Sequence, residues 1–236
     1  MSPAASRTSL LTSQASGRAK ARRCLLRNAP SNIGRFVFLE NQVNIGIYIY
    51  PEAEVLDFSG PFEVFSTASR LCGAEAPFSV YLIAENSEAV PARGGYKVLP
   101  DYSIKDHPPL DVLIISGGVH TSEMKNKTVA NWIERQAESV ELMATVCTGV
   151  FLLANAVQSL SCKVTTHWED IPELRRLFGQ LDVLEGVRWV DEGSIVSSGG
   201  ISAGIDMSLH LVSRLHSDEL AEKTARQMEF TWTKNV

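Results

Sequence analysis

Residues 143–154 read MATVCTGVFLLA, and this stretch decides the fold. A strand-like apolar run ends at Cys147, and a helix-like apolar run begins at about Thr148. A cysteine on a strand-to-helix turn holds its side chain over the edge of a sheet, where helix-terminal N–H groups favour a thiolate. The alternative interpretation is a small cysteine buried in the core. Cys147 is therefore the first candidate for chemistry.

The alternation of strand and helix continues on both sides of this stretch. The pattern predicts strands over 43–50, 78–84, 110–116, 141–146, 163–166, 188–190 and 193–200. It predicts helices over 61–71, with Pro61 at the first helical position and Glu63 in the first turn, and over 129–137, 148–157, 169–178, 202–215 and onward to 232. Each crossover places a helix on a sheet face, so we expect an α/β fold with a mostly parallel sheet between helices. Residues 41–236 contain no repeat or linker and are expected to form one domain.

The first 40 residues differ in composition from the rest of the chain. They hold seven basic residues and one acidic residue, and they are rich in Ser, Ala and Arg. This composition is typical of an organellar transit peptide, such as a mitochondrial one, and the alternatives are a disordered extension or a wrongly chosen start codon. The remaining residues hold 15 basic and 26 acidic groups. An acidic body lacks the positive surface that nucleic acid requires.

The cysteines and the longest uncharged stretch limit the location of the protein. The other three cysteines, Cys24, Cys72 and Cys162, stand at irregular spacing with no CxxC pair, which favours a reducing compartment such as the cytoplasm. Residues 142–162 carry no charge but include several polar side chains and a central glycine. A buried strand followed by a buried helix fits this stretch better than a membrane span.

Three further groups follow predicted strands, where the ligand crevice of an open α/β sheet forms. Asp57 precedes the first predicted helix; a carboxylate near a cysteine can exchange protons with substrate, and the alternative is one that only orders the turn. Gly117 and Gly118 let backbone N–H groups approach a ligand, as in an oxyanion hole. His167 in TTHW is a further candidate, with a hydrogen-bonded structural role as the alternative. GxGxxG, GxxxxGK[ST], HExxH and GxSxG are absent from the sequence, so no cofactor or metal is predicted.

From about Val43 to Trp232 the chain resembles the ThiJ/PfpI superfamily. Six blocks carry the resemblance in order: NIGIYIYPEAEVLDFSGPFEVF, LDVLIISGG, ATVCTGVFLLA, VTTHW, SSGGISAGIDMSLHLV and ARQMEFTW. Members share a class I glutamine amidotransferase-like, flavodoxin-like fold with a cysteine at a nucleophile elbow. LDFSGP, VCTG, TTHW and GGISAGID together look most like the isonitrile hydratase branch and the sensor domain of AraC-type transcription regulators.

The resemblance implies a role for each matching residue. By this likeness, the site contains the nucleophile Cys147, its acidic partner Asp57, the shaping residue Thr148, the backbone turn Gly117 and Gly118, and His167, which matches a histidine near the cysteine of the parkinsonism-linked redox protein. The block Gly199 to Asp206 also matches, without individual roles.

Two departures from other branches bear on the reaction. PfpI-like peptidases and several glyoxalase-like members have His directly after the cysteine, whereas this chain has Thr148, so we expect no peptidase activity. The redox protein has Glu where this chain has Asp57, so we expect thiolate stabilisation to differ here. The match at His167 leaves a glyoxalase-like or redox-stress function open.

The function implied by the resemblance is a lyase reaction: cofactor-free hydration of an isonitrile, a small molecule, to an N-formamide. The alternative from another class is a non-catalytic ligand-sensing domain. A homodimer is expected, and no association with membranes. AraC-type regulators continue into a DNA-binding domain whereas this chain ends at Val236, so we expect no direct binding of nucleic acid.

Overall fold

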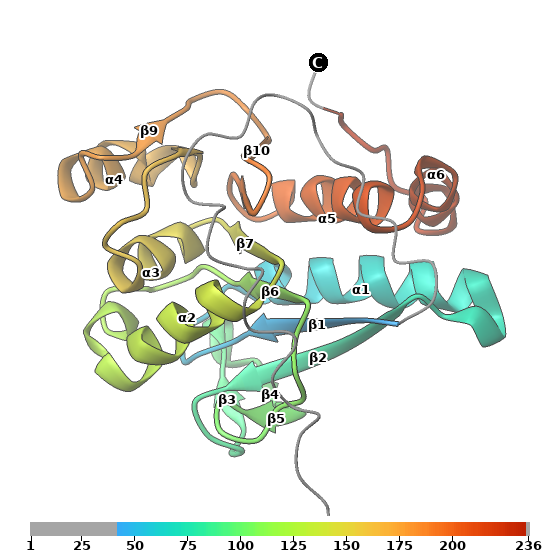
Figure 1. Ribbon diagram of the computed structural model, residues 1–236, viewed down its shortest axis with the longest axis horizontal. Helices are drawn as coiled ribbons and strands as arrows, with labels where there is room; N and C mark the ends of the chain where they lie inside the picture. The colour runs from blue at the N-terminus through green and yellow to red at the C-terminus, as the bar shows by residue number, and fades with distance from the viewer. Residues whose placement is uncertain (1–41, 235–236) are drawn as a thin grey trace, which may run out of the picture. The chain divides into compact units, whose positions relative to one another are not determined.

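One sheet of seven strands runs through the molecule (Figure 1). The computed structural model describes residues 42–234, and the predicted basic leader over 1–40 lies outside the described residues. The strand order is β10-β11-β7-β6-β1-β2-β5. All neighbouring strands pair in parallel except β10 and β11, which confirms the predicted mostly parallel sheet. The strands are β1 (Val43–Tyr48), β2 (Phe78–Ala84), β5 (Tyr102–Ser103), β6 (Val112–Ile115), β7 (Leu142–Val146), β10 (Trp189–Asp191) and β11 (Ile195–Ser198).

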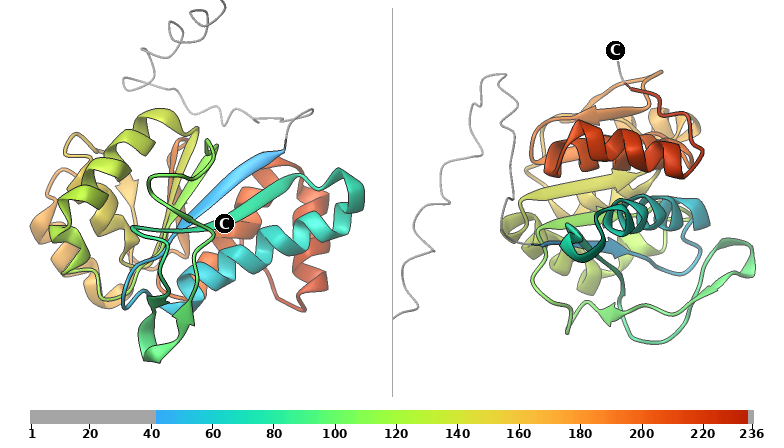
Figure 2. Two further views of the ribbon diagram at one scale, coloured as in Figure 1. Left: turned by 90° about the horizontal axis from the view of Figure 1, so that it is seen from below. Right: turned by 90° about the vertical axis from the view of Figure 1, so that its right-hand side faces the viewer.

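Helices cover both faces of the sheet, as Figure 2 shows from two directions. On one face, α1 (Val55–Cys72), α5 (Ala203–Leu215) and α6 (Asp218–Gln227) pack against one another. On the other face, α2 (Lys127–Ser139) packs against α3 (Gly149–Ala156). Outside the main sheet lie α4 (Ile171–Leu177) and two small strand pairs, β3 (Val90–Pro91) with β4 (Lys97–Val98) and β8 (Lys163–Val164) with β9 (Asp182–Val183). The expected α/β, flavodoxin-like arrangement is confirmed.

The central strands are buried on both faces. Every residue of β6 and β7 is buried, which explains why the sequence shows apolar runs there rather than alternation. The uncharged stretch 142–162 contains β7 and α3, both packed in the core. Within residues 42–234, no helix has the length and apolar character needed to cross a membrane.

The first helix begins earlier than the sequence predicted. Glu54 is still extended, with φ −67° and ψ 126°, and α1 starts at Val55. Pro61 therefore lies inside the helix and Glu63 beyond its first turn, so both expected positions were wrong. Proline has a helical φ, but it lacks the N–H that would donate to the carbonyl four residues back and its ring crowds that carbonyl. The helix nevertheless continues through Pro61. As a consequence, Asp57 lies in the first turn of α1 rather than in a loop.

The last helix ends before the predicted position. α6 stops at Gln227, because Glu229 takes a left-handed φ of 51° and the N–H of Phe230 donates to the carbonyl of Ala225 at 2.9 Å. The expected extension to Trp232 was wrong. The indole N–H of Trp232 instead donates to the carbonyl of Asp206, 3.1 Å away, which holds the tail against α5.

Close packing fixes the residue at which α3 begins. A Cβ atom on Gly149 would lie 2.2 Å from the carbonyl oxygen of Ile115 at the end of β6. Backbone cannot move aside as a flexible side chain can, so the turn between β7 and α3 accommodates only glycine at this position.

We predict that Gly149→Ala destabilises the fold by about 3 kcal/mol, because the new methyl group overpacks against backbone. The matched control is Gly179→Ala, where nothing lies within 4 Å of the added Cβ. This control should change the free energy of unfolding by no more than about 0.5 kcal/mol. Urea unfolding of both variants measures the difference, and equal stabilities would contradict the close approach.

Candidate active site

Three neighbouring strands end at the same edge of the sheet. The register sets position 48 of β1 beside 115 of β6, and 115 beside 145 of β7. Two residues further on, past the ends of β1, β6 and β7, the sequence places Tyr50, Gly117 and Cys147, respectively. The structure therefore brings the candidates Cys147 and Gly117 together at the carboxyl ends of parallel strands, and it adds Tyr50, which the sequence analysis did not single out.

Cys147 occupies the turn between β7 and α3. Its φ is 55°, the left-handed region that a non-glycine residue rarely adopts. Its N–H lies 3.2 Å from the carbonyl of Ser198 and 3.3 Å from that of Gly199, and its own carbonyl accepts a bond of 2.8 Å from the Thr166 hydroxyl. These contacts hold the turn, and the side chain is buried with 7% of the residue exposed.

Asp57 reaches this site from the first turn of α1. It is completely buried, and its Oδ2 accepts a hydrogen bond of 3.0 Å from the N–H of Gly117. Its Oδ1 is also buried and has no hydrogen-bond partner within the described part of the chain. The Gly117 amide therefore holds one oxygen of the carboxyl group, and the Cys147 thiol is close enough to act on its pKa.

Burial controls the ionisation of both groups. It raises the pKa of Asp57 to about 7, with a further rise from Glu54, while the Gly117 amide and the Cys147 thiol act in the opposite direction. Burial also raises the pKa of Cys147 to about 12, helped by the negative charge of Asp57. The backbone N–H groups of Thr148 and Ile201 lower the pKa of Cys147, but by less. Burial therefore outweighs the helix-terminal amides in setting the pKa of this thiol, and a nearby base is needed to take its proton.

Gly117 creates the space in which these groups meet. A Cβ atom at this position would lie 2.8 Å from both Asp57 Oδ2 and Cys147 Cβ, and 2.5 Å from the Thr148 nitrogen. Any side chain there would fill the site. Its N–H already donates to Asp57, so its observed contact is with the acid rather than with an open ligand position.

Gly118 and Thr148 are joined by two hydrogen bonds. The Thr148 hydroxyl donates to the Gly118 carbonyl and accepts from the Gly118 N–H, both at 2.9 Å. Gly118 has a φ of 137°, and a Cβ there would lie 2.3 Å from the carbonyl oxygen of Glu52. The backbone N–H of Gly118, like that of Gly117, already donates to a group inside the protein. This favours a positioning role for the two glycines over the expected oxyanion hole.

The loop before α5 closes the site from the other side. Ile201 has a left-handed φ of 52°, and its N–H acts on the Cys147 sulfur as described above. The sequence pattern around Gly199 to Asp206 matched a family block but gave no signal for this backbone contact.

His167 borders the same loop. A Cβ on Gly200 would lie 2.0 Å from His167 Cδ2, so the imidazole packs directly on that glycine. Its Nδ1 lies 3.5 Å from Asp170 Oδ2 and accepts a 3.4 Å bond from the Glu169 N–H. Asp170 is close enough to raise the pKa of Cys147 slightly. His167 thus lies at the edge of the site, beside Asp170.

The two other cysteines within the described residues show no comparable setting. Cys72 and Cys162 are half-buried free thiols, and burial raises the pKa of each. Cys24 lies outside the described residues. Across 42–234, no cluster of three His, Cys, Asp or Glu side chains has the arrangement of a metal site.

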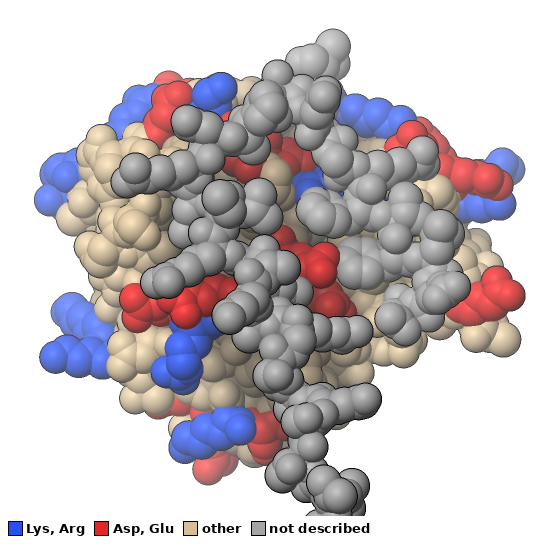
Figure 3. Space-filling model, in the orientation of Figure 1, with Lys and Arg blue, Asp and Glu red and all other residues tan. Residues whose placement is uncertain are grey.

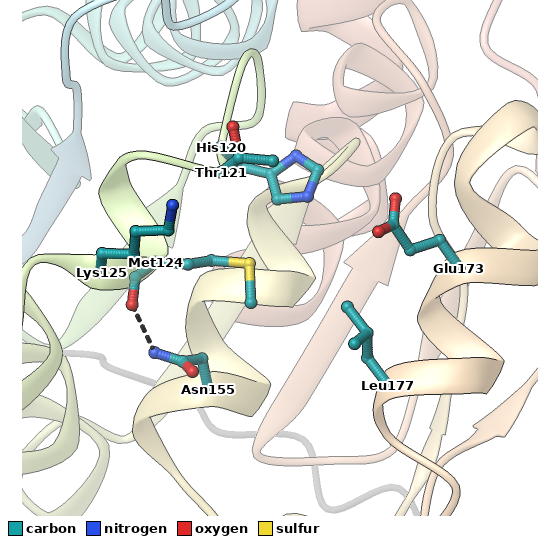
Figure 4. A pocket seen from close by; sticks show the side chains of 7 residues that line it. All are labelled: His120, Thr121, Met124, Lys125, Asn155, Glu173 and Leu177. Carbon is teal, nitrogen blue, oxygen red and sulfur yellow. Dashed lines mark hydrogen bonds between the residues drawn. The ribbon is translucent and has the colours of Figure 1, made fainter.

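A hollow of about 320 Å³ lies beside the site, between α3, α4 and the turn after Gly118 (Figure 4). The amide of Asn155 donates to the carbonyl of Met124 across its floor at 2.9 Å. His120 connects the hollow to the site, because its Nδ1 lies 3.4 Å from the Gly118 carbonyl. The lining is His120, Thr121, Met124, Lys125, Asn155, Glu173 and Leu177.

Charges of both signs are interspersed on the visible face of the molecule (Figure 3). This face gives no test of nucleic-acid binding, which stays a prediction from composition.

The sequence profile of the DJ-1/PfpI family matches residues 43–214. The chain belongs to this family. It is 28% identical over 189 residues to isonitrile hydratase of Pseudomonas putida, covering 80% of this chain and 78% of that protein. It is 25% identical over 197 residues to the HTH-type transcriptional regulator GbdR of Pseudomonas aeruginosa, covering 83% of this chain and 53% of the regulator. The chain therefore spans about half the length of this regulator.

Solved structures of the DJ-1/PfpI fold agree with the architecture. DJ-1beta of Drosophila melanogaster superimposes with a TM-score of 0.70 at 19% identity, covering 81% of this chain and all of that one. At this identity the comparison establishes the shared fold. The expected relation to the ThiJ/PfpI superfamily is confirmed by the family profile.

We predict that Asp57→Asn stabilises the protein at alkaline pH. The folded-state pKa of Asp57, about 7, lies above its ordinary value of 3.8, so its contribution to stability is lost as pH rises toward and through 7. Asparagine keeps an acceptor for the Gly117 N–H and carries no charge. The free energy of unfolding of Asp57→Asn should exceed that of wild type by a margin that grows by about 2 kcal/mol between pH 5 and pH 8.

Chemical unfolding at the two pH values measures this gain. Glu88→Gln, at an exposed carboxylate, is the control and should show no such growth. If the stability gained by Asp57→Asn does not depend on pH, the pKa of the Asp57 carboxyl group is not raised in the folded protein.

Proposed function

We propose that the protein hydrates an isonitrile to an N-formamide without a cofactor, with Cys147 as the nucleophile. The observation that carries this proposal is the buried pair of Cys147 and Asp57 at the carboxyl ends of parallel strands. The 28% identity to isonitrile hydratase supports the substrate class. The Thr148 that follows the cysteine supports hydration over peptide hydrolysis.

In the first step, the sulfur of Cys147 bonds to the terminal carbon of R–N≡C. Asp57 takes the thiol proton, because a thiol with a pKa of about 12 is protonated at neutral pH and needs a base. A carboxyl group with a pKa of about 7 can both accept and return that proton near neutrality. The proton then passes to the same carbon, which gives the covalent thioimidate R–N=CH–S–Cys147.

In the second step, water adds to the carbon of the thioimidate. Asp57 accepts a proton from the water and passes it to the substrate nitrogen, so that R–NH–CH(OH)–S–Cys147 forms. The carbon–sulfur bond then breaks, the hydroxyl proton moves to the departing sulfur, and R–NH–CHO leaves. The balance is one water added for each isonitrile consumed.

The remaining site residues position these groups. The N–H groups of Thr148 and Ile201 stabilise negative charge as it develops on the sulfur. Gly117 orients Asp57, and Gly118 fixes the Thr148 hydroxyl. His167 lies at the border of the site, where it can contact the substrate.

The expected homodimer is also a proposal, drawn from the family resemblance and from the prevalence of two-fold pairs. The organellar alternative for the location depends on the leader, which lies outside the described residues.

We predict formamide production that depends on Cys147 and rises with pH. The purified chain is incubated with a small isonitrile, and N-formamide is followed by NMR. Cys147→Ala should lose turnover and keep its fold, whereas Cys72→Ala, at a half-buried cysteine elsewhere, should keep turnover. The rate should rise through a midpoint near pH 7 as Asp57 loses its proton. Full activity in Cys147→Ala would rule out the mechanism.

Ligand sensing without catalysis is the second candidate, favoured by the similarity to GbdR over 83% of this chain. A sensor should bind its ligand equally well when the cysteine cannot react. A ligand that raises the unfolding midpoint of wild type and Cys147→Ala alike, with no product formed, would favour this function. Lactate produced from methylglyoxal would instead favour a glyoxalase-like activity.

A further inference from the structure

Tyr50 lies beside the same site, just past the end of β1. It comes two residues after the last residue of β1, at the level of Gly117 and Cys147 in the neighbouring strands. Asp57 and Cys147 are both close enough to Tyr50 to raise the pKa of its phenol, which places its side chain beside this pair. Because Gly117 has no side chain, the space between Tyr50 and Cys147 stays open to Asp57.

The hydroxyl of Tyr50 is buried without a partner. The residue is 1% exposed, and its Oη has no partner within ordinary hydrogen-bond geometry among the described groups. The Thr148 hydroxyl lies close enough to lower the pKa of Tyr50, but it donates its proton to the Gly118 carbonyl. Tyr48, at the end of β1, provides the contrast. The centroids of the Tyr48 and Tyr50 rings are 6.0 Å apart, but the Tyr48 hydroxyl donates a hydrogen bond of 2.5 Å to Glu123 Oε1.

Two unpartnered polar atoms thus share one small site, Tyr50 Oη and Asp57 Oδ1. Buried polar groups nearly always have a partner, in the protein or in an ordered water. Each of these atoms can be satisfied by one water, which accepts from the phenol and donates to the carboxylate. Such a water would keep a lone pair directed away from both groups.

The surrounding charges keep Tyr50 a donor. Burial raises its pKa well above the ordinary value, the negative charges of Asp57 and Glu123 add to the effect, and the Thr148 hydroxyl acts in the opposite direction. The phenol therefore stays protonated at every pH at which the site works. A neutral O–H next to a carboxylate can orient a water without exchanging its own proton.

We propose that Tyr50 and Asp57 Oδ1 together hold the water that is consumed in the second step, beside the sulfur of Cys147. This inference rests on the proposed function for the use of the water, but the water position itself does not. Tyr50 is a positioning residue: its O–H donates to the water oxygen, Asp57 takes the water proton, and the oxygen bonds to the thioimidate carbon. No oxidant or further reactant is needed.

A double-mutant cycle tests the water position without substrate. Tyr50→Phe, Asp57→Asn and the double variant are unfolded by heat at pH 8, with Tyr81→Phe as the control at a half-buried tyrosine away from the site. A shared water predicts that Tyr50→Phe lowers the unfolding midpoint in wild type and has a smaller effect in the Asp57→Asn background. Additive effects, or a higher midpoint for Tyr50→Phe, would overturn the water position, because removing an orphaned hydroxyl should be neutral or stabilising.

Turnover with a small isonitrile tests the use of the water. Tyr50→Phe should lower kcat by roughly tenfold to a hundredfold, because a misplaced reactant slows its step by such factors. Cys147 should then accumulate the thioimidate, seen as an added substrate mass on the intact protein. Wild-type kcat without this accumulation would overturn the catalytic use. If wild type itself forms no formamide, the proposed function fails and the catalytic use with it, while the cycle still decides the water position.

Discussion

The carboxyl group of Asp57 is removed from water completely, and within the described chain one of its two oxygens accepts a hydrogen bond, from the Gly117 N–H. Placing a carboxylate in such surroundings is costly unless it is paired. The protein does not supply a cation here. It supplies a single amide and a thiol, so the acid retains its proton up to about neutral pH.

The geometry around this acid depends on glycines that no other residue can replace. Gly117 lets the acid, the cysteine and the backbone of Thr148 approach one another, and Gly149 lets α3 begin directly against β6. Gly118 adopts a backbone angle that a side chain would strain and lies against Glu52. The site is therefore formed mainly by close approach of backbone, with few side chains of its own.

Much of this arrangement could be predicted because buried parallel strands leave a strong apolar signal. β2 was predicted with its observed bounds, Phe78–Ala84, and the turn at Cys147 was found between a strand and a helix. The start of α1 was missed. Proline is preferred at the first position of a helix, which favoured a start at Pro61, whereas in the folded protein the helix begins at Val55. The turn predicted help for a thiolate from helix-terminal N–H groups. The opposing effect of burial comes from distant segments, which the local sequence does not show.

The places of the Ile201 N–H and the Tyr50 hydroxyl at the site could not be predicted from the sequence for a related reason. Ile201 acts through its N–H, and any residue type carries that group. Tyr50 belongs to an apolar run in which an aromatic residue usually signals core packing. Its relation to Cys147 follows from the register of three strands, which only the folded chain defines.

The segment that closes the site is fastened through Asp206 by residues 232 and 233. Gly199 donates its N–H to the carbonyl of Arg188 at 2.8 Å, and the Nε of Arg188 donates to the buried carboxylate of Asp206 at 2.6 Å. Asp206 in turn holds the tail through its carbonyl and through a 2.7 Å bond from the Thr233 N–H. These bonds join Thr233, Asp206, Arg188 and Gly199 in one chain of contacts, so a change at residue 233 can be transmitted to the loop that packs against Cys147.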